Sequence, residues 1–310
     1  MELAATASRA FDALGGVDLA RRAEIDPSVR TTEVVPVLGQ LGVLDLDPRA
    51  DPVELAASAM MCEAAGRVAL PYPLAAAVVR DAGGRPTACV PSGAARVDHA
   101  SVVEEWRVGA FDGSYGGSGR CTGVLATRLG PFVGDLVLDD ATPPPLLDLL
   151  VHQCLVSWTV LGTIDRAVEL ATSHVVGREQ FGQALAAFQA VQFQLADAAV
   201  SVAGLRELAK FTLWRLDQDG EDARADVFAL RLHALESARS VLRACQQLHG
   251  AAGVCDEYDV SVLVRLVQPA LRLPVGVDGT LDALTAAVAS DGFVGLFPHG
   301  GDLTAAGPAS

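Results

Sequence analysis

Basic and aromatic residues are both scarce in this chain of 310 residues. Lysine and arginine together number 23 against 38 acidic residues, which leaves a formal net charge of −15, and aromatic residues make up only 5% of the chain. Proteins that recognise nucleic acid or anionic membranes gather Lys and Arg on one face to neutralise phosphates. The acidic balance therefore argues against nucleic acid or a membrane surface as a partner.

The sequence also lacks targeting, disulfide and metal signals. Its first residues, M-E-L-A-A-T-A-S-R-A-F-D, contain no uninterrupted apolar run, and the longest apolar stretch, residues 146–164, is broken by Asp148, His152 and Gln153. The six cysteines form no C-x-x-C pair, and the histidines show no spacing typical of metal ligands. We expect a soluble cytoplasmic protein without a disulfide framework or a metal site.

What is abundant is apolar sequence, and its pattern predicts three domains in a mostly α fold with a small β domain. Hydrophobic residues make up 51% of the chain, enough for a large core. Residues 1–80 show helical spacing and stop at a Pro-Tyr-Pro turn, which indicates an N-terminal helical domain. Residues 81–145 carry short apolar runs between glycines and turn residues (88–90, 108–111, 123–126 and 132–138), which indicates a reduced middle β domain. Residues 146–310 are predicted to form a C-terminal helical bundle.

The bundle is predicted to contain long helices over residues 146–176, 184–210 and 226–249. The first is apolar almost all round, as expected of a central helix, and Gly162 would allow a neighbouring helix to approach closely. In the second, four apolar residues lie on one stripe: Val191, Leu195, Val202 and Leu205. Gly250 follows the third, where a glycine in the left-handed conformation is expected to end the helix. The glycine-rich run at 112–120 is predicted to be a hairpin turn.

Two stretches of the bundle carry the functional signal. In R-E-Q-F-G, Arg178 lies between two predicted helices, and a guanidinium there can hold a phosphate with two parallel hydrogen bonds. The alternative is an ordinary solvated loop arginine. In Q-L-H-G-A-A-G, Gly250 and Gly253 follow a helix, and glycines let backbone N–H groups approach a bound anion. The alternative is a simple helix terminator.

Taken together, the two stretches resemble the acyl-CoA dehydrogenase family in order, separation and helical context. R-E-Q-F-G, then F-Q, then L-A-D ending at Asp197, is similar to one family signature. Q-L-H-G-A-A-G, followed by D-E-Y and Arg265, is similar to a second, and E-A-A-G-R at 63–67 to an earlier segment. The resemblance covers most of the chain and is strongest after Val151.

This resemblance implies a fold with an N-terminal helical domain, a middle β domain and a C-terminal four-helix bundle, and an FAD that lies across a subunit interface. The residues that match the family's cofactor contacts are Arg178, Phe181, Gln189, Gln247 and Gly250. It implies that the arginine and the Gln247 loop hold the FAD pyrophosphate, that the phenylalanine lies beside it, and that Gln189 reaches the adenosine side. The chain departs from the family pattern at position 251, where alanine replaces the second glycine.

The family's reaction needs a carboxylate base, and the match here is incomplete. The resemblance implies removal of the α-proton of an acyl-CoA thioester by a glutamate in E-G-T, while a hydride passes to the flavin. The closest match is V-D-G-T, which makes Asp278 the catalytic candidate. Its side chain is one methylene shorter, and it lies further from Arg265 than in the family. The alternative is an N-cap or loop before a helix over residues 281–289.

The predicted β region is about half as long as the family's and lacks its T-E-P-x-x-G-S-D and W-I-T-N-G segments. The chain in this respect resembles the short subunits of actinobacterial heteromeric acyl-CoA dehydrogenases, which act on steroid-derived or otherwise bulky acyl-CoA thioesters. We therefore expect an FAD-dependent subunit that shares its cofactor site with a second acyl-CoA dehydrogenase-like chain in a heterotetramer. Two alternatives stay open: a homo-oligomeric dehydrogenase that uses Asp278 as its base, and a non-catalytic structural subunit without flavin.

Overall fold

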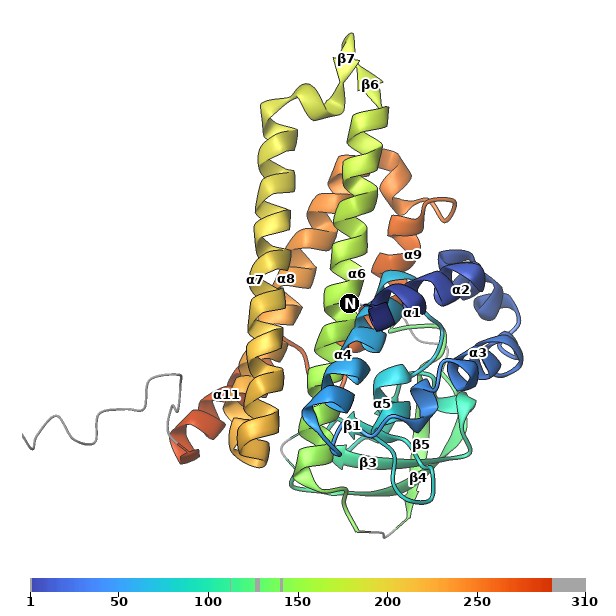
Figure 1. Cartoon of the computed structure of the whole chain (residues 1–310), viewed down its shortest axis with the longest axis vertical. Coiled ribbons are helices and arrows are strands. Elements are labelled where there is room, and N and C mark those ends of the chain that lie inside the picture. Colours follow the sequence, from blue (N-terminus) through green and yellow to red (C-terminus); the bar gives the residue numbers. More distant parts are fainter. Residues whose placement is uncertain (1, 112, 126–128, 140–141, 292–310) are drawn as a thin grey trace, which may run out of the picture.

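Three long helices run side by side through the molecule; the N-terminal helices and a sheet pack against one side of them, and the last helix lies on the other side (Figure 1). The computed structural model describes residues 2–111, 113–125, 129–139 and 142–291. The long helices are α6 (Leu146–Gly177), α7 (Gln189–Asp219) and α8 (Arg224–His249), and they are followed by α9 (Asp259–Leu266), α10 (Gln268–Arg272) and α11 (Val277–Asp291). The N-terminal helices are α1 (Glu2–Ala13), α2 (Val17–Ile25), α3 (Val35–Gln40), α4 (Pro52–Arg67) and α5 (Leu74–Val78). This confirms the predicted fold class, a mostly helical protein with a small β region.

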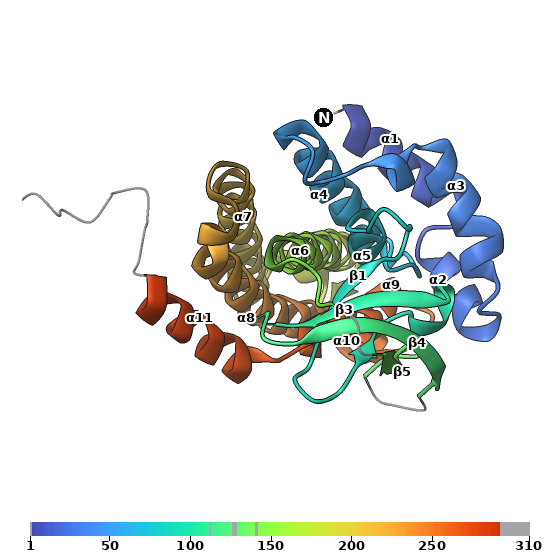
Figure 2. The ribbon, with the colours of Figure 1, turned by 90° about the horizontal axis from the view of Figure 1, so that it is seen from below.

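Helix α6 is the centre of the molecule, with α7, α8 and α4 around it (Figure 2). It meets α4 at two glycines: a Cβ on Gly162 would lie 2.8 Å from the carbonyl carbon of Glu63, and a Cβ on Gly66 would lie 2.9 Å from that of Thr159. Thr163 donates a hydrogen bond of 3.0 Å to the Gly66 carbonyl across the contact. The close approach predicted at Gly162 is therefore confirmed, because neither position has room for a side chain.

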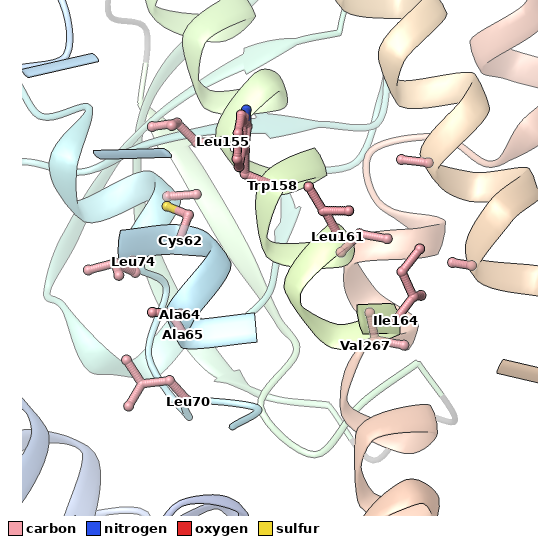
Figure 3. Close-up of a cluster of buried hydrophobic side chains, with 14 of the residues drawn as sticks. Cys62, Ala64, Ala65, Leu70, Leu74, Leu155, Trp158, Leu161, Ile164 and Val267 are labelled. Atoms are coloured by element: carbon pink, nitrogen blue, oxygen red, sulfur yellow. The ribbon is translucent and has the colours of Figure 1, made fainter. Parts of the chain in front are cut away.

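The N-terminal helices and the bundle share one hydrophobic core around this contact. Trp158 and Leu161 of α6 pack there with Cys62 of α4, and Leu70 and Val267 extend the cluster toward the loop after α4 and toward α9 (Figure 3). An ion-pair network covers the same contact, because Arg67 pairs with Asp165 and Glu169 while Arg206 pairs with Glu63. The core thus fixes α6, whose far end carries Arg178.

A five-stranded sheet packs beneath α6 in the order β1-β3-β4-β5-β2. Its strands are β1 (Thr87–Val90), β2 (Arg96–Val97), β3 (Glu105–Ala110), β4 (Gly116–Val124) and β5 (Gly134–Asp139); β1 and β3 are parallel, and the other pairs are antiparallel. Trp106 of β3 is fully buried in the sheet's own core and donates its indole N–H to the Ala100 carbonyl at 3.0 Å. Ala126, in one predicted run, lies outside the described residues.

The glycine-rich run at 112–120 was expected to form a turn, and that expectation is wrong for its second half. Residues from Gly116 onward belong to β4 and pair with β3. A Cβ on Gly116 would lie 2.9 Å from the Cα of Gly109 on the neighbouring strand. The glycine is therefore explained by close packing within the sheet as well as by the turn.

Helix α7 begins five residues later than predicted, at Gln189, and runs to Asp219 instead of Lys210. The residues before it form a small hairpin, β6 (Glu179–Gln180) with β7 (Gln183–Ala184), and a 3-10 turn over Leu185–Ala187. The predicted stripe is confirmed, with Val202 and Leu205 buried and Val191 and Leu195 half-buried.

Two stretches, Leu146–Gly177 and Asp259–Ser290, are long and apolar enough to cross a membrane by length and composition alone. In the first, 83% of the most apolar 18-residue window is buried inside the protein, so its apolar surface faces protein neighbours, and core helices of globular proteins have the same composition.

Candidate cofactor cleft and inner cavity

The R-E-Q-F-G stretch forms the end of α6 and a hairpin that projects beyond the bundle (Figure 1). Arg178 caps α6, and its backbone N–H donates to the His174 carbonyl at 2.9 Å. Phe181 and Gly182 at the hairpin tip both have positive φ, +53° and +79°, as a two-residue hairpin turn requires. Phe181 is a rare non-glycine residue in this conformation, and 91% of it is exposed. The hairpin thus presents an uncovered aromatic ring beside the arginine.

The Q-L-H-G-A-A-G stretch ends α8 and turns into a short helix, η6 (Gly250–Val254). Gly250 caps α8 with φ +60°, as a glycine permits, although its ψ of −138° lies outside the left-handed helical well. Gly253 must lack a side chain, because a Cβ there would lie 2.5 Å from the Gln246 carbonyl oxygen. The same loop is held by the Gln246 amide, which donates to the Gly253 carbonyl at 3.1 Å. The alanine at position 251 is exposed, so the loop accepts its methyl group.

These two stretches, far apart in sequence, line one open cleft of about 780 Å³ at the end of the bundle. Of the sequence-predicted cofactor residues, Arg178, Gln247 and Gly250 lie in its wall, whereas Phe181 and Gln189 are exposed outside it. The cofactor-binding roles of all five residues stay predictions. The complete wall is Ser173, His174, Gly177, Arg178, Gln180, Leu185, Val191, Gln194, Gln247, Leu248, His249, Gly250, Ala251, Ala252 and Tyr258.

No carboxylate lines this cleft among the described residues, although the protein as a whole is strongly acidic. The nearby Asp256 is paired with Arg265, which lowers the pKa of that carboxyl, and Asp259 is paired with Arg21 at 3.0 Å. The cleft wall therefore offers a guanidinium, imidazoles, amides and a glycine-containing turn. That donor set suits an anion with several phosphate oxygens.

Three aromatic side chains of the cleft lie together; His249 and Tyr258 belong to the second stretch and the D-E-Y segment after it, whereas His174 was missed by sequence reasoning. The rings of His174 and His249 stack at 4.5 Å, and Tyr258 meets both edge-on at 6.4 Å. His249 is buried, and its Nδ1 lies 2.7 Å from the Cys245 carbonyl oxygen. The spacing of His174 and Arg178 could have indicated the position of His174. It precedes Arg178 by four residues, about one helical turn, at the same end of α6.

A second, inner cavity of about 150 Å³ lies between α6, the sheet and the segment after α4. Its walls are mostly apolar, and its polar groups include Asp98, His99, His152 and Gln153. Burial raises the pKa of Asp98 to about 7 and lowers the pKa values of His99 and His152 to about 3. Ligand pockets commonly measure about 300–1,000 Å³. The inner cavity is smaller than that, whereas the outer cleft lies within this range.

Asp278, the candidate base, lies exposed in the first turn of α11 and lines neither cavity. Helix α11 packs on α8, on the side away from the sheet (Figure 2). The chain before it is held by the buried Arg231, which donates to the carbonyls of Leu273 and Val275 at 2.7 and 2.8 Å. The catalytic role of Asp278 stays a prediction.

The arrangement of helices and sheet is that of the acyl-CoA dehydrogenase fold. A variant of the Tcur3481-Tcur3483 steroid ACAD aligns over 93% of this chain and 97% of its own, with a TM-score of 0.77 and 21% identity. The ChsE4-ChsE5 complex from Mycobacterium tuberculosis aligns over 93% and 96%, with a TM-score of 0.74 and 18% identity. Identities this low establish the fold alone.

Sequence similarity points to the same family. Residues 149–284 match the model for "Acyl-CoA dehydrogenase, C-terminal domain", which is a little under half of the chain. Acyl-CoA dehydrogenase FadE28 of Mycobacterium tuberculosis is 30% identical over 125 residues, 40% of this chain and 37% of FadE28. (R)-benzylsuccinyl-CoA dehydrogenase of Thauera aromatica is 31% identical over 107 residues, 34% of this chain and 26% of that enzyme. The matches thus span 26% and 37% of these curated relatives' length.

Proposed function

We propose that this chain is one subunit of an FAD-dependent acyl-CoA dehydrogenase that acts on a bulky, steroid-type acyl-CoA thioester in an assembly with a second, related chain. Its cleft holds the pyrophosphate of an FAD whose flavin ring lies in the partner. When bound, the flavin accepts the hydride from the β-carbon of the acyl group. The residues of this chain bind and orient the cofactor.

The single observation that carries the proposal is the convergence of Arg178, Gln247 and the turn at Gly250 on one carboxylate-free cleft. A pyrophosphate needs donors from several directions, and a guanidinium can grip it with two parallel hydrogen bonds. Any carboxylate in the wall would repel it, and the wall has none among the described residues; Asp256 and Asp259, next to it in sequence, are paired with Arg265 and Arg21. The donor set of this structure therefore fits the cofactor that the sequence motifs indicate.

The other half of the reaction site is better supplied by a partner than by this chain. The inner cavity is too small for an acyl-CoA tail together with a flavin ring, and the close contacts at Gly66 and Gly162 leave no space between α4 and α6 there. Asp278 faces solvent away from both cavities. A second chain could supply the missing space for the flavin ring and acyl group and the missing catalytic base.

Exposed apolar side chains support assembly with another chain. Phe181 at the hairpin tip is 91% exposed, and Phe193, Val200 and Trp214 of α7 are 60%, 72% and 48% exposed. The α7 residues are spaced by seven and fourteen, which places them on one face of the helix. Large apolar groups gathered in this way are typical of interfaces between subunits. Among the structures with this fold, ChsE4-ChsE5 is a complex of two chains, and Tcur3481-Tcur3483 is described as a steroid ACAD.

The decisive experiment is purification of the chain alone and after co-expression with the products of adjacent reading frames, followed by the visible spectrum. Flavin absorbance only in the pair is the expected result. Flavin absorbance in the chain alone would favour the homo-oligomer, and colourless protein in both preparations would favour the structural subunit.

An arginine variant tests whether this cleft is the site that binds the flavin. Arg178→Ala should reduce the flavin content of the purified pair at least tenfold, since charge-assisted hydrogen bonds each contribute about 1.5–3 kcal/mol. Arg9→Ala, which removes an exposed arginine of α1, is the matched control and should keep full flavin content. Full flavin content in Arg178→Ala would refute the assignment of this cleft.

A further inference from the structure

The cleft contains two stacked imidazole rings, those of His174 and His249, and in the described part of the chain no hydrogen bond joins them. His174 comes from the last turn of α6 and His249 from the end of α8, and their rings lie nearly parallel, 25° apart, at 4.5 Å. The Nδ1 of His249 is occupied by the Cys245 carbonyl at 2.7 Å. His174 is only half-buried and lies in the cleft wall beside Arg178.

The cleft wall around this stack contains no carboxylate among the described residues, and Glu179, which follows Arg178 in the hairpin, is exposed outside the wall. Arg178 follows His174 on α6, His249 comes from α8, and the loop before α9 contributes the neutral phenol of Tyr258. Asp256 on the same loop is bound by Arg265, and Glu257 is exposed outside the cleft wall. Burial first, and then His249 and Arg178, lower the pKa of His174. In the free chain a proton on this ring is therefore unfavourable at neutral pH.

We propose that His174 is a proton-coupled ligand of the FAD pyrophosphate: binding of the diphosphate draws one proton from solvent onto the imidazole stack. A diphosphate brings two negative charges into a cleft whose wall, among the described residues, carries the guanidinium of Arg178 and no carboxylate, and an opposite charge within about 4–6 Å favours the protonated imidazole. The stacked His249 stays fixed by its own hydrogen bond to the Cys245 carbonyl. This inference rests on the proposed function.

The sign of the pH dependence follows from linkage. The pKa of His174 is low in the free chain and higher in the complex, so the complex holds more protons and affinity rises as pH falls. Each pKa unit gained on binding is worth up to about tenfold in affinity. We expect FAD to bind at least about fivefold more tightly at pH 6 than at pH 8.

Calorimetric titration with FAD tests this in the purified chain, or in the pair where a partner co-purifies. Running it at pH 6, 7 and 8 in two buffers of different ionisation enthalpy measures the protons taken up directly. The variants are His174→Gln and His174→Phe, the second of which keeps a ring on His249 but cannot be protonated. His233→Gln on α8 is the matched control, because His233 does not line the cleft.

The proposal expects proton uptake and pH-dependent affinity in wild type and in His233→Gln, and loss of both in the two His174 variants. FAD binding without proton uptake, or with the same uptake in His174→Phe, would overturn this inference and leave the proposed function intact. Absence of FAD binding at every pH, alone and in the pair, would overturn the proposed function and the inference with it.

Discussion

The contact between α4 and α6 makes a sharp stability prediction at Gly162. In Gly162→Ala the new Cβ would lie 2.8 Å from the Glu63 carbonyl carbon and 3.1 Å from its Cα. These are backbone atoms of a packed helix, so no side-chain rotation relieves the clash, and the two helices must separate by roughly 1 Å. A gap of that size forfeits about a quarter to a half of each van der Waals contact across the interface.

The magnitude follows from two opposing terms. Overpacking a core costs about 1–3 kcal/mol, and a backbone obstacle places this site at the upper end. Alanine in place of glycine inside a helix stabilises the folded state by about 1 kcal/mol. We expect a net loss of about 2 kcal/mol in the free energy of unfolding, and a melting temperature lower by about 4–8 °C.

Gly204→Ala is the matched control, because it is also a glycine inside a long helix. A Cβ there meets only His233 Nε2, at 3.9 Å, so the helix-propensity gain should appear without the clash. Thermal melts followed by circular dichroism should place Gly204→Ala about 0.5–1 kcal/mol above wild type in stability. If Gly162→Ala melts at or above wild type, the described contact between α4 and α6 is refuted.

Three further predictions concern single residues. The pKa of Asp98 is raised to about 7, so the stability of its neutral form is fully present below about pH 4 and is lost as pH rises through 7; Asp98→Asn should therefore raise the melting temperature at pH 8 and leave it unchanged at pH 4. Asp278→Asn should leave turnover of the assembled enzyme almost unchanged, since the carboxylate lines neither cavity, and loss of most turnover would instead identify it as the base. Phe181→Asn keeps a residue suited to positive φ ahead of Gly182, so the melting temperature of the chain should not fall, while association with the partner, measured by calorimetry, should weaken at least about tenfold. Unchanged association would show that the hairpin tip lies outside the interface.

Local chemistry was sufficient to predict much of the fold. The periodicity of apolar residues predicted α6 and α8 to within two residues at each end, because a buried helix must repeat its apolar face. Two predictions about glycines, close packing at Gly162 and the end of a helix at Gly250, are confirmed, because both follow from the missing side chain. The late start of α7 was not predicted, because the hairpin before it depends on the turn at Phe181 and Gly182, which apolar spacing does not report.

For the candidate site too, residue types were predictable from the sequence, whereas their arrangement in space was not. The sequence alone determined that Arg178 and the Gln247 turn carry donors suited to a phosphate, since that depends on residue type and local backbone. Only the tertiary structure decided that both line one cleft, that His174 and His249 stack within it, and that Asp278 lies outside it. These are distances between segments about 70 to 100 residues apart in the chain, and they are fixed by how α6 and α8 pack against each other, which no local pattern encodes.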